Sequence, residues 1–345
     1  MPRMISAIVT VYNRAAMIGA AIDSLAGQLA DNLEIIVVDD GSTDDSARVV
    51  EAIADPRIRL IRHDGNRGIP AARNTGLEAA RGDFIAWLDS DDLARPGRLE
   101  RQARFLDANP AVAMIGGCAG RMTKDGRPRR GARVPMLTHE DIRAQLLFRS
   151  AFQQSSIMGR ADILKAFPYS PSFPVCEDID MFVRLTAEHR VANLPSILVD
   201  RRLHEGQTIH RESLQIRERT GEIARRSLAN LGLSAGKEDV ERHVTLGNLK
   251  AQPAGREFLG WSEDWLARIV SANRAARIYD PDALAFVSGR VWLRACLAGW
   301  RGPDRQFAID RFARSPLTRA AANRHGRTWF GQAAGMLLGF GDGQG

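Results

Sequence analysis

The sequence predicts an α/β protein, in which a mainly parallel sheet carries helices on both faces and is followed by a helical C-terminal region. Over the first hundred of the 345 residues, short apolar runs alternate with amphipathic stretches. This alternation is typical of parallel strands joined by helices. From about residue 211 the pattern is helical and rich in alanine and arginine, so we expect a boundary near residues 210–235.

The expected elements follow one another in β-α order along the chain. Strands are expected at residues 6–11, 33–38, 58–62 and 84–88, and helices at residues 15–29, 46–54 and 70–80. Beyond these we expect helices at 97–109, 138–148 and 179–188, strands at 111–119, 155–158 and 197–201, and a polar turn or loop at 123–131. Ligands of such sheets bind beyond the carboxyl ends of the strands, so polar residues that follow strands are the candidates for a site.

The net charge of +7 is unevenly distributed. Residues 1–210 hold 27 basic and 27 acidic residues, whereas residues 211–345 hold 21 and 14. A basic end suggests an anionic partner such as a membrane surface or a charged glycan, although a solvated helical surface would give the same pattern. The chain has no zinc-finger spacing, aromatic ribonucleoprotein motif or glycine-rich lysine clamp, so we expect no nucleic-acid partner.

Cysteine usage and hydropathy indicate the compartment. Cys118, Cys176 and Cys296 are an odd number and lie far apart, which fits a reducing compartment and argues against a disulfide framework or a zinc site. The N-terminus shows no charged-then-apolar leader, and no run reaches about 18 apolar residues, so neither a signal peptide nor a spanning helix is expected. We expect a cytoplasmic protein, either free or peripheral at the inner face of the membrane.

The most informative motif is an apolar strand that runs directly into carboxylates. Residues 84–88 precede Asp89, Asp91 and Asp92. Clustered carboxylates repel one another and are costly to bury, so the cluster predicts a compensating cation. Hard divalent ions such as Mg²⁺ or Mn²⁺ prefer such oxygen ligands. The alternative is a solvated loop that caps the next helix.

Three further segments follow strands or lie close to their ends. Asp39 and Asp40 begin a turn in which a carboxylate could accept from a base N–H or a ribose hydroxyl. Ser42, Thr43 and Asp44 in the same turn could simply cap a helix. At the end of the first strand, Tyr12 could stack on a base and Arg14 could pair with phosphate, or both could belong to an ordinary loop. Arg73, in the segment Asn66 to Gly76, could reach a diphosphate.

Together these segments resemble the family 2 glycosyltransferases of the GT-A fold. The motifs that carry the resemblance occur in the family's order; they are Tyr12-Asn13, Asp39-Asp40-Gly41-Ser42, Asn66 to Gly76, Asp89-Ser90-Asp91 and Glu177-Asp178. The resemblance covers about residues 4–210. It implies a Rossmann-like GT-A catalytic domain at 1–215, with a nucleotide-sugar half at about 1–110 and an acceptor half at about 111–215, and then a basic, mainly helical region at 216–345.

The resemblance also implies roles for individual residues. For nucleotide-sugar binding they are Thr10, Tyr12, Arg14, Asp39, Asp40, Arg73, Asp89, Ser90 and His204, of which Thr10, Tyr12 and Asp40 would line the base pocket. Asp91 would be the principal ligand of Mn²⁺ or Mg²⁺, with Asp89 and His204 beside it. The pair Glu177-Asp178 would hold the catalytic base, and Asp178 is the favoured candidate. One departure from the family is Lys165-Ala166-Phe167-Pro168, where relatives carry a Gly-Gly-Phe turn.

The implied function is inverting transfer of a sugar from a nucleoside-diphosphate sugar, UDP-linked as the usual case, to an acceptor hydroxyl. The acceptor would be a glycan, a lipid-linked glycan or a protein, in bacterial-type surface polysaccharide or glycoconjugate synthesis. The alternatives are a catalytically silent module that binds a nucleotide sugar or a partner, a nucleotidyltransferase, and a nucleotide-sugar hydrolase. Nucleotidyl transfer usually needs a basic glycine-rich loop, and the first loop here offers only Arg14.

The C-terminal region combines amphipathic helices with a basic end. Helices are expected at 261–269 and 283–300, and residues 301–330 hold seven arginines against two aspartates. The apolar stretch from Trp329 to Phe340 follows. This order suits an interfacial anchor on anionic lipid, and docking onto the catalytic domain is the alternative.

Overall fold

The computed structural model describes residues 3–28, 32–133, 135–204, 212–249 and 254–321. The chain forms two compact units, which are described separately. Of the described residues, the first unit holds those up to 137 together with 152–213, and the second holds 138–151 together with those from 214 to 321. The expected division at residue 215 was linear along the chain, whereas residues 138–151 in fact pack with the C-terminal helices.

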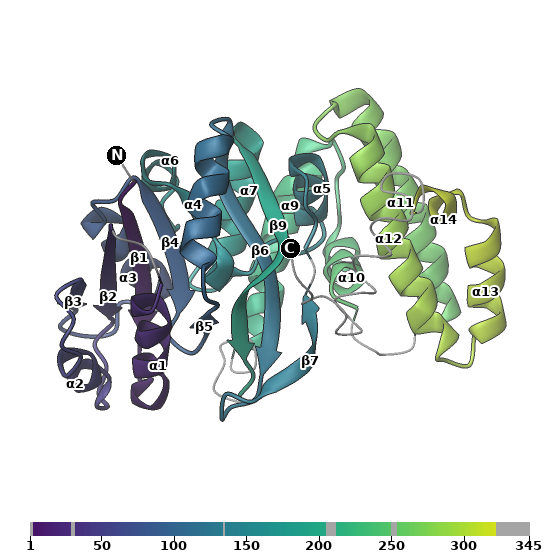
Figure 1. Ribbon diagram of the computed structural model, residues 1–345. Helices are drawn as coiled ribbons and strands as arrows, with labels where there is room; N and C mark the ends of the chain where they lie inside the picture. Colours follow the sequence, from purple (N-terminus) through teal and green to yellow (C-terminus); the bar gives the residue numbers. More distant parts are fainter. Residues whose placement is uncertain (1–2, 29–31, 134, 205–211, 250–253, 322–345) are drawn as a thin grey trace, which may run out of the picture. The chain divides into compact units, whose positions relative to one another are not determined.

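The first unit is built around one sheet (Figure 1). Its elements are β1 (Ile5–Val11), α1 (Ala15–Ala26), β2 (Leu33–Asp39), α2 (Ser46–Glu51), β3 (Ile58–Arg62), α3 (Ile69–Ala79), β4 (Phe84–Asp89), β5 (Leu93–Ala94), α4 (Arg98–Ala108), β6 (Val112–Met122), β7 (Pro128–Arg133), a 3-10 turn (Gln154–Ser156), β8 (Met158–Arg160), α6 (Ala161–Ala166), α7 (Glu177–Glu188) and β9 (Arg190–Arg202). The strand order is β3-β2-β1-β4-β8-β6-β9-β5, and β7 pairs with β6.

The strand pairing confirms the predicted fold class. β1 pairs in parallel with β2 and β4, and β2 pairs in parallel with β3. β8 is antiparallel to both β4 and β6, while β6 and β9 are parallel. The sheet is therefore mainly parallel, with short antiparallel strands at β5, β7 and β8.

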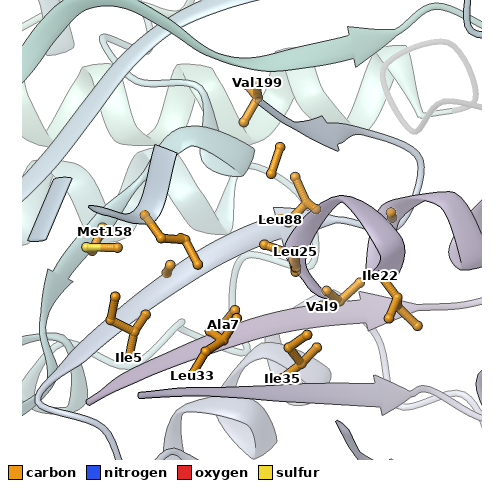
Figure 2. Packing of buried hydrophobic residues seen from close by; sticks show 14 of the residues in the cluster. Ile5, Ala7, Val9, Ile22, Leu25, Leu33, Ile35, Leu88, Met158 and Val199 are labelled. Carbon is orange, nitrogen blue, oxygen red and sulfur yellow. The ribbon is translucent and has the colours of Figure 1, made fainter. Parts of the chain in front are cut away.

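Both faces of β1 are covered because its side chains alternate between two helices. Figure 2 shows Val9 beside Ile22 and Leu25 of α1, and the odd-numbered neighbours of Val9 in β1 belong to the same buried cluster. On the opposite face, Ile8 meets Gly76 of α3, where an added Cβ would lie 2.5 Å from the Ile8 side chain. A side chain at residue 76 would push α3 off the sheet, which explains why glycine suits that position.

The register of the parallel strands aligns the candidate site residues at one edge of the sheet. Thr10 of β1 lies opposite Val38 of β2 and opposite Asp89 of β4. One residue later, Val11 lies opposite Asp39. The turns that follow β1, β2 and β4 therefore begin at the same level, at the carboxyl ends of the strands where ligands of such sheets bind.

Three expected segments differ in type or extent from the structure, and β5 and α6 were not expected at all. Residues 128–133, expected within or next to a polar loop, form the edge strand β7. β9 spans Arg190–Arg202 rather than 197–201, because its first half pairs with β6 despite a polar sequence that contains proline. The strand expected at 155–158 begins at Met158, and the 3-10 turn occupies Gln154–Ser156.

The second unit is helical. It contains α5 (His139–Leu146), α9 (Ser213–Asn230), α10 (Lys237–Gly247), α11 (Arg256–Ala276), α12 (Pro281–Trp300), α13 (Arg305–Arg314) and α14 (Pro316–Ala320). α12 packs against α5, α11, α13 and α14. None of the helices described here combines the length and apolarity that a membrane span requires. The proposed anchor from Trp329 to Phe340 lies outside the described residues.

A buried histidine links the helices of this unit. Nε2 of His243 donates to the carbonyl oxygen of Leu147 (2.8 Å), and Nδ1 accepts from Nε1 of Trp265 (3.0 Å). Both contacts suit a neutral imidazole, and burial lowers the pKa of His243 to about 4. His243 is thus a structural residue that holds the turn after α5 against α10 and α11.

Candidate active site

The turn after β4 concentrates carboxylates around a single hydroxyl. Oγ of Ser155 lies 2.8 Å from Oδ2 of Asp89 and 2.5 Å from Oδ2 of Asp92. A hydroxyl has one proton to donate, so it cannot donate a full hydrogen bond to each of two ionised carboxylates. Burial raises the pKa of both aspartates. The pKa of Asp89 is lowered again by the nearby Arg73 and raised by Asp91. The pKa of Asp92 is raised further by the charges of Asp91 and Asp89. The turn therefore holds more negative charge than its protein partners neutralise.

The end of β9 fixes the shape of this turn. The backbone N–H of Arg202 donates to Oδ1 of Asp92 (3.0 Å), and its Nε donates to the carbonyl oxygen of Asp91 (2.9 Å). Two residues later, Nε2 of His204 lies 2.8 Å from Oδ2 of Asp91. Asp91 and His204, which are 113 residues apart in the chain, are thus held in direct contact.

A buried arginine lies beneath the acidic turn. The side chain of Arg98 is fully buried and donates to the carbonyl oxygens of Trp87 (2.7 Å) and Ile157 (3.3 Å). Burial lowers its pKa to about 9, and the charges of Asp92 and Asp89 act in the opposite direction. Arg98 therefore compensates part of the acidic charge from inside the protein, which leaves the outer side of the turn available to a ligand.

A second buried arginine joins the acidic turn to α7. Nη1 of Arg73 lies 2.5 Å from Oε1 of Glu177, and Nη2 lies 3.4 Å from Oδ1 of Asp89. Its guanidinium carbon also sits 5.2 Å from the ring centre of Tyr169. Breaking such a buried pair by removing one partner typically costs about 3–5 kcal/mol. Arg73 thus fixes the start of α7 relative to the end of β4.

The two acids at the start of α7 have different environments. Glu177 is 5% exposed, and burial raises its pKa to about 7, with Arg73 acting against the rise and Asp178 adding to it. Asp178 is half-buried, and its Oδ1 accepts from the N–H of Ile179 (2.8 Å). Glu177 is therefore occupied by an ion pair, whereas Asp178 keeps an oxygen with no hydrogen bond from a described residue.

The turn after β2 is held by backbone donors. Oδ1 of Asp40 accepts from Nδ1 of His63 (2.7 Å) and from the N–H of Arg67 (2.9 Å), while Oδ2 accepts from the N–H of Gly68 (2.9 Å). Asp40 was expected to line a base pocket, and the structure shows it fastening the loop before α3. The fully buried Asp39 accepts from the N–H of Ser42 through Oδ1 (3.0 Å), and its Oδ2 has no hydrogen-bond partner among the described residues.

The loop after β1 is anchored to the β2 turn and borders a groove. Oδ1 of Asn13 accepts from the N–H of Thr43 (2.8 Å), and Tyr12 is 40% exposed beside it. The groove has a volume of about 680 Å³. Its lining residues are Asn13, Arg14, Ala15, Ala16, Met17, Asp44, Lys124, Leu203 and His204. Three cationic or imidazole side chains in one groove favour an anionic ligand.

The donor set fits a hard divalent ion that is completed by substrate oxygens. Within the described parts of the chain, no three histidine, cysteine, aspartate or glutamate side chains converge as a ready-made metal site. Asp91 and His204 are in contact, however, and Asp89 belongs to the same charge-rich turn. Mg²⁺ and Mn²⁺ commonly take few protein carboxylates together with water and substrate phosphates.

The structure brings most of the predicted residues together and adds others. Thr10, Asp89, Ser90, Asp91 and His204 lie at or next to the carboxyl edge of β1 and β4. Sequence reasoning missed Ser155, Arg98, Arg202, Tyr169 and Lys124. Of these, Arg202 carried a usable signal, since it lies two residues before the predicted His204. A serine, a tyrosine or a lysine in a loop carries none.

Known proteins share both the sequence pattern and the fold. The family model for glycosyl transferase family 2 matches residues 6–167. A Haemophilus influenzae protein described as an uncharacterized glycosyltransferase is 31% identical over 220 residues, which cover 59% of this chain and 67% of that protein. The chain belongs to glycosyl transferase family 2.

Two further relatives are a protein named for succinoglycan biosynthesis and a putative glycosyltransferase. The succinoglycan biosynthesis protein ExoO of Rhizobium meliloti is 43% identical over 152 residues, which cover 41% of this chain and 43% of that protein. The putative glycosyltransferase EpsE of Bacillus subtilis is 34% identical over 191 residues, which cover 53% of this chain and 67% of that protein. The chain thus matches less than half the length of ExoO, so the similarity to ExoO concerns one part of that protein.

Solved structures confirm the GT-A-type fold. S. aureus TarS 1–349, in complex with UDP-GlcNAc, superposes with a TM-score of 0.55 at 19% identity, over 90% of this chain and 91% of that chain. The mannosyltransferase PcManGT of Pyrobaculum calidifontis, in complex with GDP-Man and Mn²⁺, gives 0.54 at 18% identity, over 93% and 86%. At these identities the likeness concerns the fold.

Proposed function

We propose that this protein is an inverting glycosyltransferase, which moves a sugar from a nucleoside-diphosphate sugar to an acceptor hydroxyl in the synthesis of a surface polysaccharide or glycoconjugate. The observation that carries the proposal is the link between two acidic groups. Arg73 joins the charge-rich turn at Asp89 to Glu177 at the start of α7, next to Asp178. A family 2 fold with a cation-attracting turn beside a second, separate carboxylate supplies the two functions that such a transfer needs.

The donor side of the proposal rests on the carboxyl edge of the sheet. The folds of TarS, in complex with UDP-GlcNAc or UDP, and of PcManGT, in complex with GDP-Man, support a nucleotide-sugar donor, and we propose a UDP-linked one. Thr10, Tyr12 and Asp39 would line the base pocket. Oδ2 of Asp39 accepts no hydrogen bond from a described residue, although Nε of Arg62 lies 3.5 Å from it, and this oxygen suits a base N–H. Asp40 would act indirectly, by holding the loop before α3.

Charged groups around the groove would hold the diphosphate. Arg14 and His204 line it, together with Lys124 from the hairpin between β6 and β7. Arg73 is buried between Glu177 and Asp89, so we assign it the positioning of α7 rather than direct contact with phosphate. Charge-assisted hydrogen bonds from arginine and lysine are the usual means of holding phosphate oxygens.

Asp91, with Asp89 and His204 beside it, would hold Mn²⁺ or Mg²⁺ together with the donor. When bound, such an ion neutralises negative charge on a departing diphosphate. PcManGT, which has a similar fold, was solved in complex with Mn²⁺, and this supports a divalent ion. The hydroxyl of Ser155 and the backbone N–H of Arg202 hold the carboxylates of Asp89 and Asp92, and Nε of Arg202 holds the carbonyl oxygen of Asp91.

Asp178 would be the base that removes the proton from the acceptor hydroxyl. Its neighbour Glu177 is held in the buried ion pair with Arg73, so we assign Glu177 to positioning α7 rather than to proton transfer. Asp178 is half-buried, and it is close enough to Asp89 and Arg73 to act on them electrostatically. A positioned general base typically contributes about 10²–10⁴-fold to the rate.

The test is a donor screen followed by a base variant. Purified protein is incubated with a panel of nucleotide sugars and Mn²⁺, Mg²⁺ or chelator, and both the thermal shift and the released nucleoside diphosphate are recorded. We expect one donor to stabilise the protein in a metal-dependent manner. Asp178→Asn should keep that shift and lose about 10²–10⁴-fold in transfer rate.

The matched control is Glu188→Gln, which removes an exposed charge from the other end of α7 and should leave the rate unchanged. Full activity in Asp178→Asn would remove the base assignment. No response to any donor with either metal would reject the transferase proposal and favour a silent binding module.

A further inference from the structure

A row of three arginines crosses the sheet next to the groove. In the register of the strands, Arg121 of β6 lies opposite Arg129 of β7 on one side and opposite Arg201 of β9 on the other. Residues directly opposite each other on neighbouring strands project to the same face, about 4.8 Å from strand to strand. The three guanidinium groups therefore belong to one face of three adjacent strands.

The exposure of the neighbouring residues shows which face this is. Met122 and Arg202, the next pair along β6 and β9, are buried, and Arg202 is bonded to the acidic turn. Arg121 and Arg129 are exposed, and Arg201 is half-buried. Since side chains alternate along a strand, the arginine row occupies the outward face, opposite the face that supports Asp91 and Asp92.

The row has no carboxylate partner in the described part of the chain. The neighbouring Asp200 pairs with Arg95 (2.7 Å), and no described acid pairs with Arg121, Arg129 or Arg201. Like charges placed directly opposite on neighbouring strands are destabilising. The fold nevertheless keeps the three arginines of the row in line. The hairpin of β6 and β7 also exposes Lys124, Arg127 and Arg130, so this surface is suited to a negatively charged partner.

β6 and β9 lead from the arginine row to residues that line the groove. β6 and β9 run parallel, and three residues beyond Arg121 and Arg201 they reach Lys124 and His204, which line the groove. Because the row faces away from the acidic turn, a ligand that lay along the row would reach the groove by passing around the ends of β6 and β9. This continuity favours a ligand of the transfer reaction over an unrelated partner.

We propose that the arginine row, Arg121, Arg129 and Arg201, binds the carboxylate groups of an acidic glycan that serves as the acceptor. The identification of the ligand as acceptor rests on the proposed function, whereas the binding of an acidic glycan does not. Arginine forks match carboxylates in a bidentate manner, and three in line present repeated sites to an extended chain. None of the exposed large apolar side chains of the described residues lies on this hairpin, which disfavours insertion into a lipid surface.

The test compares a charged oligosaccharide with its uncharged counterpart. A labelled hexamer of galacturonate and the same hexamer as its methyl ester are titrated with the full chain, and fluorescence anisotropy is recorded at low and high salt. We expect the acid to bind and the ester not to, and we expect the affinity to fall as salt rises. The double variant Arg121→Gln/Arg129→Gln should weaken binding at least about tenfold, given two lost charge-assisted contacts.

The matched control is Arg81→Gln, which removes an exposed arginine that lies at the start of β4, away from the row. It should bind the acid as the unaltered protein does, and the donor-induced thermal shift should be the same in all variants. Equal binding of acid and ester, or full affinity in the double variant, would overturn the proposal. So would capture of anionic phosphatidylglycerol vesicles through the same arginines without binding of the acid.

The outcomes also separate this proposal from the proposed function. Acid binding that depends on the arginines, in a protein that responds to no nucleotide sugar, would keep the glycan surface and reject the transferase. A response to a nucleotide sugar without arginine-dependent binding of the acid would keep the transferase and reject the glycan surface.

Discussion

The turns after β2 and β4 look alike in sequence and differ in how their charge is neutralised. Each places aspartates directly after a buried parallel strand. In the β2 turn, Asp40 accepts from His63 and from two backbone N–H groups within 2.9 Å. In the β4 turn, Asp89 and Asp92 share the hydroxyl of Ser155, and burial raises the pKa of both.

The number of hydrogen-bond donors around each carboxylate distinguishes a structural carboxylate from a ligand-binding one. A carboxylate whose oxygens are filled by fixed donors stabilises the fold and has little left for a ligand. A carboxylate cluster that lacks donors gains most from an added cation. The β2 turn is therefore expected to affect stability most, and the β4 turn is expected to affect activity most.

The largest effect is expected for Asp91→Asn. We expect transfer to fall about 10³-fold, because stabilisation by a bound metal is typically worth several kcal/mol and about 1.4 kcal/mol corresponds to a factor of ten. The melting temperature should stay the same or rise, because the substitution removes a like charge from beside Asp89 and Asp92. Initial rates at saturating metal and a thermal melt without ligand provide the two readouts.

The control is Asp64→Asn, at a fully exposed side chain in the loop after β3. It should change neither the rate nor the melting temperature. A strong loss of stability in Asp91→Asn with the rate unchanged would show that the β4 turn stabilises the fold and does not bind a ligand of the reaction.

A smaller effect, on stability, is expected for Asp40→Ala. The substitution leaves His63 and the N–H groups of Arg67 and Gly68 without their acceptor. Hydrogen bonds to a charged group are worth about 1.5–3 kcal/mol, so we expect the free energy of unfolding to fall by about 3 kcal/mol. Urea denaturation would measure this loss, and Asp40→Asn should lose less because it keeps one acceptor oxygen. Unchanged stability would show that water replaces the carboxylate.

The sequence predicted the half of the sheet whose strands are local and apolar. Parallel strands such as 33–38 are continuous apolar runs between turn residues, and this pattern depends on burial on both faces. The same pattern placed Asp39 and Asp89 at one edge, as the register of β1 with β2 and β4 confirms. These elements could be predicted because each sequence signal lies within the element itself.

The rest of the site depends on contacts between distant parts of the chain. Ser155 reaches Asp89 from 66 residues away and Arg202 reaches Asp92 from 110 residues away, so no local pattern marks them. β7 was expected to be a loop because an exposed edge strand of arginines has no apolar alternation. α5 packs in the second unit although its chain neighbours belong to the first, which a linear division of the sequence cannot show.

The smallest effect is expected at Asn13, which ties the end of β1 to the β2 turn. Asn13 has a positive φ of 53°, and its Oδ1 accepts from the N–H of Thr43 (2.8 Å). Asn13→Gly should lose about 1 kcal/mol with the hydrogen bond while keeping the backbone conformation. Asn13→Ala should lose about 1 kcal/mol more, since a Cβ disfavours the left-handed region. Urea denaturation of both variants measures the difference, and equal losses would show that the side-chain bond alone holds this loop in place.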